Sequence, residues 1–290
     1  MVDRKQALVT GASTGIGRAI AVALAEAGFD VAITPRDLEP IASLDPVVAL
    51  IAEAGTTALV VPLDLVDRSS AQRTAGVLLE RWGGVDVLVH SARHLGPGHH
   101  DSLMGGEIAD IERHIEGNFF TPLVLDRALV PAMTRRGGGL IVNLDSTAAY
   151  SDPIRPLGDG GWGLSYGASK AALHRSAGIL AVELRAMNIA CINVDPGTVR
   201  LEAIEPGPGR RGSDLDGPAA AAVGRACAWL ASEPGEAMRH TGRTVFAQFL
   251  AHERGLVPGW RGPSRMPSRT ARPDDAPAQF VANQAPRPEP

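Results

Sequence analysis

Short apolar runs alternate with longer segments of helical spacing along most of this 290-residue chain. The apolar runs are continuous and do not alternate with polar residues, which is typical of parallel strands buried on both faces. Strands are expected at residues 7–9, 31–33, 58–61, 85–89, 140–144, 189–194 and 244–246. Helices are expected between them, at residues 16–27, 47–54, 69–82, 108–136, 166–187 and 219–231.

This repeated strand–helix order predicts an α/β fold, a Rossmann-type, doubly wound parallel sheet of about seven strands with helices on both faces. The three layers form one domain over residues 1–260. Residues 261–290 hold seven prolines and five arginines, so we expect a disordered tail there. The longest expected helix contains Pro122 and Pro131, and kinks are expected at both.

Composition narrows the function classes. The apolar share is 44% and the charged share 21%, and the net charge of −4 comes without a basic run, so no nucleic-acid partner is expected. The aromatic share of 4% indicates a core of Ala, Val, Leu and Ile. No stretch has the length of a membrane helix and Met1–Thr10 does not resemble a signal peptide. We therefore expect a cytoplasmic protein without a membrane partner.

Cysteines and histidines suggest no further chemistry. Cys191 and Cys227 lie in apolar surroundings and are expected to act as small hydrophobic residues. His94, His99 and His100 lie in a Gly/Pro-rich loop without a clear further ligand or fixed geometry, so we expect a solvated loop near the substrate and no metal site.

A glycine-rich turn directly follows the first expected strand. It reads Thr10-Gly11-Ala12-Ser13-Thr14-Gly15-Ile16-Gly17 and leads into a helix. Gly11 allows a sharp turn, Gly15 lets the backbone approach a pyrophosphate, and Gly17 lets the helix pack against the strand. Free N–H groups and the helix dipole favour phosphate at such a helix start. The strand–turn–helix context predicts a dinucleotide site.

The end of the second strand bears on the choice between NAD and NADP. An acidic residue there binds the ribose 2′-OH of NAD, whereas an arginine accommodates the 2′-phosphate of NADP. Pro35 stands at the expected acidic position and Arg36 follows it, with Arg18 as a second cation. We therefore favour NADP(H). Asp37, the next residue, leaves NAD(H) open, as does the interpretation of Arg36 as a solvated charge.

Tyr166 and Lys170 stand at positions i and i+4 of an expected helix and so share one face. A nearby ammonium favours the tyrosinate, which makes the phenol a usable proton donor and acceptor near neutral pH. Tyr150, the only other tyrosine, has no lysine at i+4. Ser146 follows a buried strand, at the edge of the sheet where ligands bind, and its hydroxyl can hold the substrate oxygen.

These motifs together resemble the classical short-chain dehydrogenase/reductase family over residues 5–247. The resemblance rests on the glycine turn, Asn118, Ser146, the YxxxK pair and Pro196-Gly197 after the sixth strand. It implies that Tyr166 is the acid/base, that Ser146 orients the carbonyl, that Lys170 binds the nicotinamide ribose and activates Tyr166, and that Asn118 holds a water on a proton relay. Further cofactor contacts are expected from Asp64, Leu65, Ser91, Ala92, Pro196, Gly197 and Val199.

The chain also departs from the family pattern. His90-Ser91-Ala92-Arg93 replaces the usual Asn-Asn-Ala-Gly, so Arg93 stands where a glycine admits the cofactor. Ser91 can still hydrogen-bond the sheet backbone. Leu201 stands where a threonine often contacts the nicotinamide. The insert 151–163 and the loops 93–106 and 198–218 should shape the substrate site.

The expected function is NAD(P)-dependent hydride transfer between nicotinamide and a ketone/secondary-alcohol pair, on a small-molecule substrate. Two alternatives stay open: a non-catalytic NADP-binding regulatory protein, which Arg93 and Leu201 favour, and a lyase or dehydratase on the same fold. The resemblance also implies a homodimer or homotetramer, formed through the helices that hold Asn118 and Tyr166. The second of these is rich in alanine, which permits close helix packing.

Overall fold

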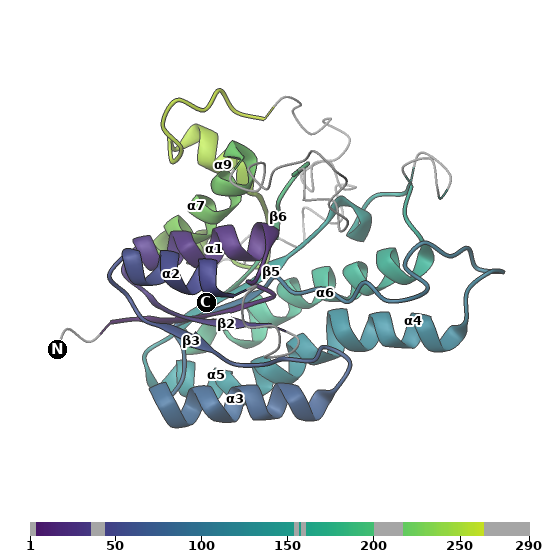
Figure 1. The fold of residues 1–290 in the computed structure, drawn as a ribbon, viewed down its shortest axis with the longest axis horizontal. Coiled ribbons are helices and arrows are strands. Elements are labelled where there is room, and N and C mark those ends of the chain that lie inside the picture. The colour runs from purple at the N-terminus through teal and green to yellow at the C-terminus, as the bar shows by residue number, and fades with distance from the viewer. Residues whose placement is uncertain (1–3, 36–43, 154–156, 158–160, 200–216, 264–290) are drawn as a thin grey trace, which may run out of the picture.

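Seven parallel strands form one sheet in this computed structural model, in the order β3-β2-β1-β4-β5-β6-β7 (Figure 1). The structure describes residues 4–35, 44–153, 157, 161–199 and 217–263. The strands are β1 Gln6–Thr10, β2 Asp30–Thr34, β3 Ala58–Val60, β4 Val87–His90, β5 Gly139–Leu144, β6 Ile189–Asp195 and β7 Thr244–Phe246. The predicted fold class is confirmed.

Helices cover both faces of the sheet. One face packs against α1 Gly15–Glu26, α2 Asp45–Glu53, α7 Pro218–Ser232, α8 Pro234–His240 and α9 Ala247–Glu253. The other packs against α3 Arg68–Trp82, α5 Thr121–Arg135 and α6 Leu164–Glu183. Short helices α8 and α9 were not expected from the sequence. No described helix combines the length and apolar character needed to cross a membrane.

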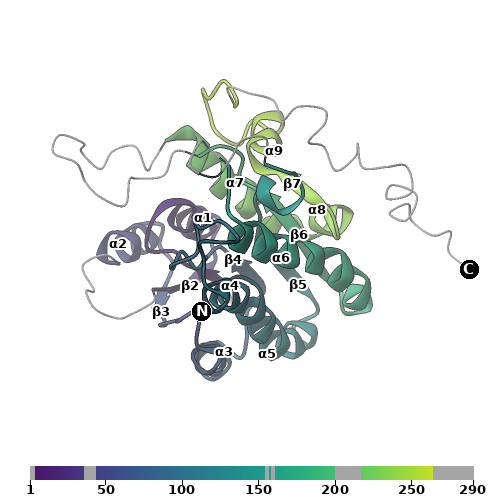
Figure 2. The same ribbon diagram turned by 90° about the vertical axis from the view of Figure 1, so that its right-hand side faces the viewer.

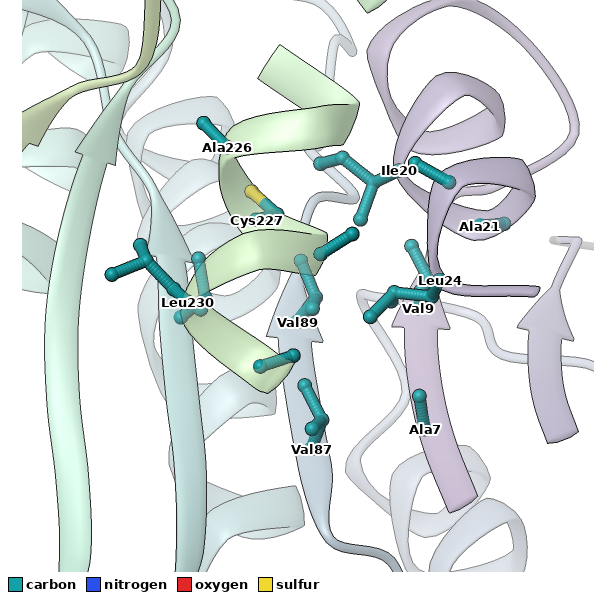
Figure 3. Packing of buried hydrophobic residues seen from close by; sticks show 14 of the residues in the cluster. Ala7, Val9, Ile20, Ala21, Leu24, Val87, Val89, Ala226, Cys227 and Leu230 are labelled. Carbon is teal, nitrogen blue, oxygen red and sulfur yellow. The ribbon is translucent and has the colours of Figure 1, made fainter. Parts of the chain in front are cut away.

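Alternate side chains of each strand point to opposite faces of the sheet, where two separate hydrophobic cores lie. Ala7 and Val9 of β1 point to the core below α1 and α7, whereas Leu8 belongs to the core below α3 and α5. Figure 3 shows small and branched side chains of β1, β4, α1 and α7 meeting in the first core. This packing explains the continuous apolar runs, because most residues of the central strands β1, β2, β4, β5 and β6 are buried. Cys227 lies in this core as a free thiol.

The long helix predicted over residues 108–136 is interrupted by a π-helical turn. It consists of α4 Ile108–Ile115, a π-helical turn Glu116–Phe120, and α5. Pro122 lies in the first turn of α5, where its missing N–H costs little, and α5 continues through Pro131. The helical pattern changes at residues 116–120, directly before Pro122, and the kinks expected at the two prolines stay a prediction.

The strand order reverses beside β1, which pairs with β2 on one side and β4 on the other. The carboxyl ends of these strands and of β5 and β6 meet at one edge, the usual ligand-binding edge of such a sheet. In Figure 2, α4 and α6 lie side by side, and residue contacts join them. This edge holds the residues discussed below. The domain boundary at residue 260 stays a prediction, and residues 264–290 lie outside the described chain.

Candidate active site

The glycine turn after β1 brings backbone segments unusually close. Gly11 has a φ of 66°, and a Cβ atom on it would lie 2.7 Å from the Cα of Ala92. A Cβ on Gly17 would lie 2.3 Å from the carbonyl oxygen of Gly11. Thr14, the N-cap of α1, makes no side-chain capping hydrogen bond, so the first N–H groups of the helix are available to an anion. The turn therefore fits the phosphates of a dinucleotide.

A single hydroxyl holds the loop after β4 beside this turn. Thr10 Oγ1 accepts hydrogen bonds from the backbone N–H groups of Ser91 and Ala92, each at 3.0 Å, and donates to the Val89 carbonyl at 3.3 Å. The sequence predicted that Ser91 would bond the sheet backbone. The described contact runs from the Ser91 backbone N–H to the side chain of Thr10, the last residue of β1, which lies 81 residues earlier in the chain.

The loop after β6 is held in a similar way. Gln248 Nε2, on α9, donates to the carbonyl oxygens of Pro196 at 2.7 Å and Thr198 at 3.1 Å. Gly197 has a φ of 65°, and its N–H donates to Asp195 Oδ1 at 2.6 Å. Gln248 is buried and was not singled out in the sequence, because nothing nearby in the chain marks its role.

The remaining predicted cofactor residues fall into three groups. Ser13 lies in the turn directly before α1, and Gly15 and Ile16 are the first residues of that helix. Val199, after β6, packs against the first core. Asp64 Oδ1 accepts the N–H of Val66, and the Leu65 carbonyl accepts the Thr121 hydroxyl at 2.7 Å. Arg36, Asp37 and Leu201 lie outside the described residues.

Helix α6 carries the predicted tyrosine–lysine pair. Tyr166 lies in its first turn, and Lys170, one turn later, is buried with its Nζ donating to the Leu144 carbonyl at 2.6 Å. Ser146 caps the short 3-10 helix η3 Thr147–Ala149, which packs against α6, and its hydroxyl accepts the N–H of Ala148 at 3.3 Å. A Cβ on Gly167 would lie 3.6 Å from the Ala148 carbonyl. The serine turn therefore lies against the turn that holds Tyr166.

Asn118 links three segments around this pair. Its Oδ1 accepts the backbone N–H of His94 at 2.6 Å, and its Nδ2 donates to the hydroxyl of Ser169 at 3.0 Å. Ser169 directly precedes Lys170. The side chain of Asn118 thus joins the loop after β4 to α6, so both of its polar atoms are engaged by protein. The expected water on a proton relay stays a prediction.

A group of histidines lies beside Tyr166. The His99 ring meets the Tyr166 ring edge-on with centroids 4.9 Å apart, and stacks on His114 of α4 at 5.8 Å. His94 meets His114 at 4.9 Å. Burial, followed by the charges of His100 and Arg93, lowers the pKa of His99 to about 4. The expectation of a solvated loop was wrong for His99, because α4 and α6 partly enclose it. The described residues hold no group of histidine, cysteine or acidic side chains placed to bind a metal.

The second tyrosine has a contrasting environment. Tyr150 donates its phenolic hydrogen to Asp195 Oδ2 at 2.5 Å. Burial, followed by the charge of Asp195, raises the pKa of Tyr150 well above its ordinary value, so this phenol keeps its proton. Next to it, His174 Nδ1 lies 2.5 Å from Asp145 Oδ2. Neither carboxylate was singled out in the sequence, although each stands at the carboxyl end of a buried strand.

Comparisons with known proteins agree with this geometry. A family model described as short chain dehydrogenase matches residues 5–206, well over half of the chain. The protein belongs to the short-chain dehydrogenase family. Among the relatives of this short-chain dehydrogenase, the 7alpha-hydroxysteroid dehydrogenase of Escherichia coli K12 is 31% identical over 204 residues, which cover 70% of this chain and 74% of that protein.

Solved structures give the same assignment. A metagenomic short-chain oxidoreductase in complex with NADP is 31% identical, with a TM-score of 0.65 over 83% of this chain and 95% of that one. L-Sorbose reductase from Gluconobacter frateurii, complexed with NADPH and L-sorbose, is 25% identical, with a TM-score of 0.68 over 84% and 94%. We conclude that this short-chain dehydrogenase is an NAD(P)-dependent oxidoreductase of alcohols or ketones.

Proposed function

We propose that this short-chain dehydrogenase prefers NADP(H) and interconverts a small-molecule ketone and its secondary alcohol, with Tyr166 as the acid/base. The observation that carries the proposal is the burial of Lys170 one helical turn from Tyr166, with the Ser146 turn packed against the same helix. The other tyrosine is bound to a carboxylate and keeps its proton. Tyr166 is therefore the phenol suited to exchange a proton with substrate.

A bound nicotinamide would supply the hydride that reduces the carbonyl carbon. The Tyr166 phenol gives its proton to the carbonyl oxygen, and the Ser146 hydroxyl donates a hydrogen bond to that same oxygen. The Lys170 ammonium stabilises the phenolate that remains, since an opposite charge nearby favours the ionised form. Asn118 holds the Ser169–Lys170 turn in place through its bond to Ser169. Oxidation of the alcohol reverses each step.

The preference for NADP(H) follows from charge at the end of β2. Pro35, directly after β2, has no carboxylate to bind a ribose 2′-OH, and Arg36 follows it in the sequence. Arg18, in the first turns of α1, adds a cation near the phosphate turn. The solved relatives bound to NADP and NADPH support the same preference. In fluorescence titrations, NADPH should bind at least tenfold more tightly than NADH, and Arg36→Ala should narrow that difference. Tighter binding of NADH would contradict the proposal.

The acid/base role is tested by Tyr166→Phe against a panel of ketones, including acetoin, a ketose and a ketosteroid. For a ketone that the unaltered enzyme reduces, kcat/KM should fall by about 10²–10⁴, because the phenolic proton is lost while the ring stays. Affinity for NADPH should change little, which shows that the site is intact. Turnover that survives in Tyr166→Phe would remove this mechanism. NADPH binding without turnover of any ketone would favour the regulatory alternative.

We also propose a homodimer or homotetramer formed through α6 and the helical segment that holds Asn118, from α4 to α5. Ile108, Ile179 and Val182 are large apolar side chains on these helices, and each is at least 48% exposed. Two of the α6 alanines, Ala177 and Ala181, are buried within the chain itself and therefore do not contribute to a partner surface. A light-scattering mass equal to one chain would contradict this assembly.

A further inference from the structure

The charge on Lys170 lacks a direct ionic partner among the described contacts of its Nζ. The ammonium is buried, with 4% of the residue exposed, and donates to the neutral Leu144 carbonyl. A buried charge is costly unless other charges compensate for it. The chain has only one other lysine, Lys5, and its remaining basic residues are arginines. Lysine differs from arginine in that burial can remove its proton, so what keeps Lys170 charged matters for the site.

Two buried carboxylates stand at the strand ends beside it. Leu144 pairs with Val194 across β5 and β6, so the next residues, Asp145 and Asp195, are neighbours at the carboxyl edge of the sheet. They are 4% and 2% exposed. Asp145 directly follows the carbonyl that binds the ammonium. The backbone therefore places both carboxylates at strand ends close to the carbonyl that binds Lys170, and the charges of both act on the lysine.

The bonding of the two carboxylates is unequal. Asp195 accepts hydrogen bonds from Tyr150, from the N–H of Gly197, and from Thr147 at 3.4 Å. Asp145 Oδ2 lies 2.5 Å from Nδ1 of His174, which is on α6 one turn beyond Lys170. The other oxygen of Asp145, Oδ1, is buried without a hydrogen-bond partner in the structure. A buried carboxylate oxygen without a donor is costly, and a nearby positive charge is what would offset that cost.

The charges facing Lys170 act in opposite directions. Burial lowers the pKa of Lys170; Tyr166, Asp145 and Asp195 raise it, and Arg93 lowers it further. Burial also raises the pKa of Asp195, as does the charge of Asp145, although the bonds from Tyr150 and Gly197 oppose this. Both carboxylates therefore oppose the effect of burial on the Lys170 ammonium.

We propose that Asp145 and Asp195 are positioning residues, a buried carboxylate pair that keeps the Lys170 ammonium protonated beside Tyr166. Their part in turnover rests on the proposed function, but the charge of Lys170 can be measured without turnover. The competing interpretation is that His174 neutralises Asp145, so that this contact only anchors α6 to the sheet.

The two-lysine composition allows a direct test on the full-length chain. In a Lys5→Arg background labelled with ¹³Cε-lysine, the single lysine resonance belongs to Lys170 and can be followed with pH. We expect Asp145→Asn to lower the titration midpoint of Lys170 by about one pH unit or more, because an opposite charge is lost, and Asp195→Asn to lower it by less. Asp145→Glu, which restores a carboxylate, should return the midpoint towards that of the parent.

Asp126→Asn is the matched control. Asp126 belongs to another buried aspartate–histidine pair, with Oδ1 2.8 Å from His90 Nε2, which joins α5 to β4. Its removal should cost stability but leave the Lys170 midpoint unchanged. The proposal would be overturned if the Lys170 midpoint in Asp145→Asn equalled that of the parent. If Asp145→Asn does not fold, an unchanged Lys170 midpoint in Asp195→Asn would overturn it. Loss of turnover in Tyr166→Phe alongside such a result would leave the proposed function intact.

Discussion

We call the region around β1 and α1 the nucleotide half of the sheet, and the region around β5, β6 and α6 the catalytic half. The two halves depend on different kinds of atoms. Around β1 and α1, the important atoms belong to the backbone, and glycines are needed because neighbouring segments leave no room for a Cβ. Around β5, β6 and α6, the important atoms are buried side-chain charges, including Lys170 and Asp195. The first half should therefore be sensitive to added volume, and the second to charge at constant volume.

The largest expected effect is in the nucleotide half. Gly17→Ala would place a methyl group 2.3 Å from the Gly11 carbonyl oxygen, a backbone atom that cannot move without shifting the turn. We expect the free energy of unfolding to fall by about 3 kcal/mol or more, and affinity for NADPH to fall at least tenfold. Chemical denaturation and fluorescence titration measure the two quantities.

The matched control for this substitution is Gly76→Ala on α3, where an added Cβ meets no atom within 4 Å. There the better helix propensity of alanine should raise the free energy of unfolding by up to about 1 kcal/mol. If Gly17→Ala and Gly76→Ala had the same free energy of unfolding and the same affinity for NADPH, the close approach of backbone segments would not shape the nucleotide half.

A smaller effect is expected in the catalytic half, at His99. Burial lowers the pKa of this imidazole to about 4 in the folded protein, whereas the unfolded chain protonates near the ordinary histidine pKa of 6.5. Stability should therefore fall as pH decreases from about 6.5 to about 4, because the unfolded state binds more protons in that window. His99 is partly exposed, so the loss should be on the order of 1–2 kcal/mol.

Denaturant titrations at pH 7 and pH 4.5 measure this loss. His99→Gln should reduce the difference in stability between the two pH values. His252→Gln, which changes an exposed histidine on α9, should preserve it. A His99→Gln variant with the same pH dependence as the unaltered protein would show that the enclosure by α4 and α6 does not control this imidazole.

The smallest effect is expected for Asp195→Asn. Burial raises the pKa of Asp195, so the folded state holds this proton to higher pH than the unfolded chain, in which an aspartate has its ordinary pKa of 3.8. The stability of the unaltered protein should therefore decrease as pH rises through that window. The variant lacks this cost, so its stability relative to the parent should improve between pH 4 and pH 7. The effect is small because hydrogen bonds from Tyr150 and Gly197 oppose the cost of burial.

A relative stability of Asp195→Asn that worsens over that pH range, measured by chemical denaturation, would indicate that the hydrogen bonds outweigh burial. The pKa of Asp195 would then lie below its ordinary value, and not above it as burial in the catalytic half predicts. This result would also place more of the negative charge beside Lys170 on Asp195.

Sequence reasoning was weakest where contacts between distant elements decide the structure. The π-helical turn that holds Asn118 was not expected, because no local pattern marks it and the bonds of Asn118 reach His94 and Ser169 in distant segments. Helices α8 and α9 are too short to produce a clear period in the sequence. His99 looked solvated because its loop is rich in glycine and proline, yet it packs against Tyr166 and His114.

The sequence by itself determined the features that depend on neighbours in the chain: the strand–helix order, the glycine turn, and the i, i+4 spacing of Tyr166 and Lys170. These follow from backbone geometry and helical period, which act over a few residues. Only the tertiary structure decided that Asp145 and Asp195 are neighbours at the strand ends near the carbonyl that binds Lys170, and that Thr10 holds the Ser91 loop. Such pairings depend on strand register and burial, which bring together groups that are tens of residues apart.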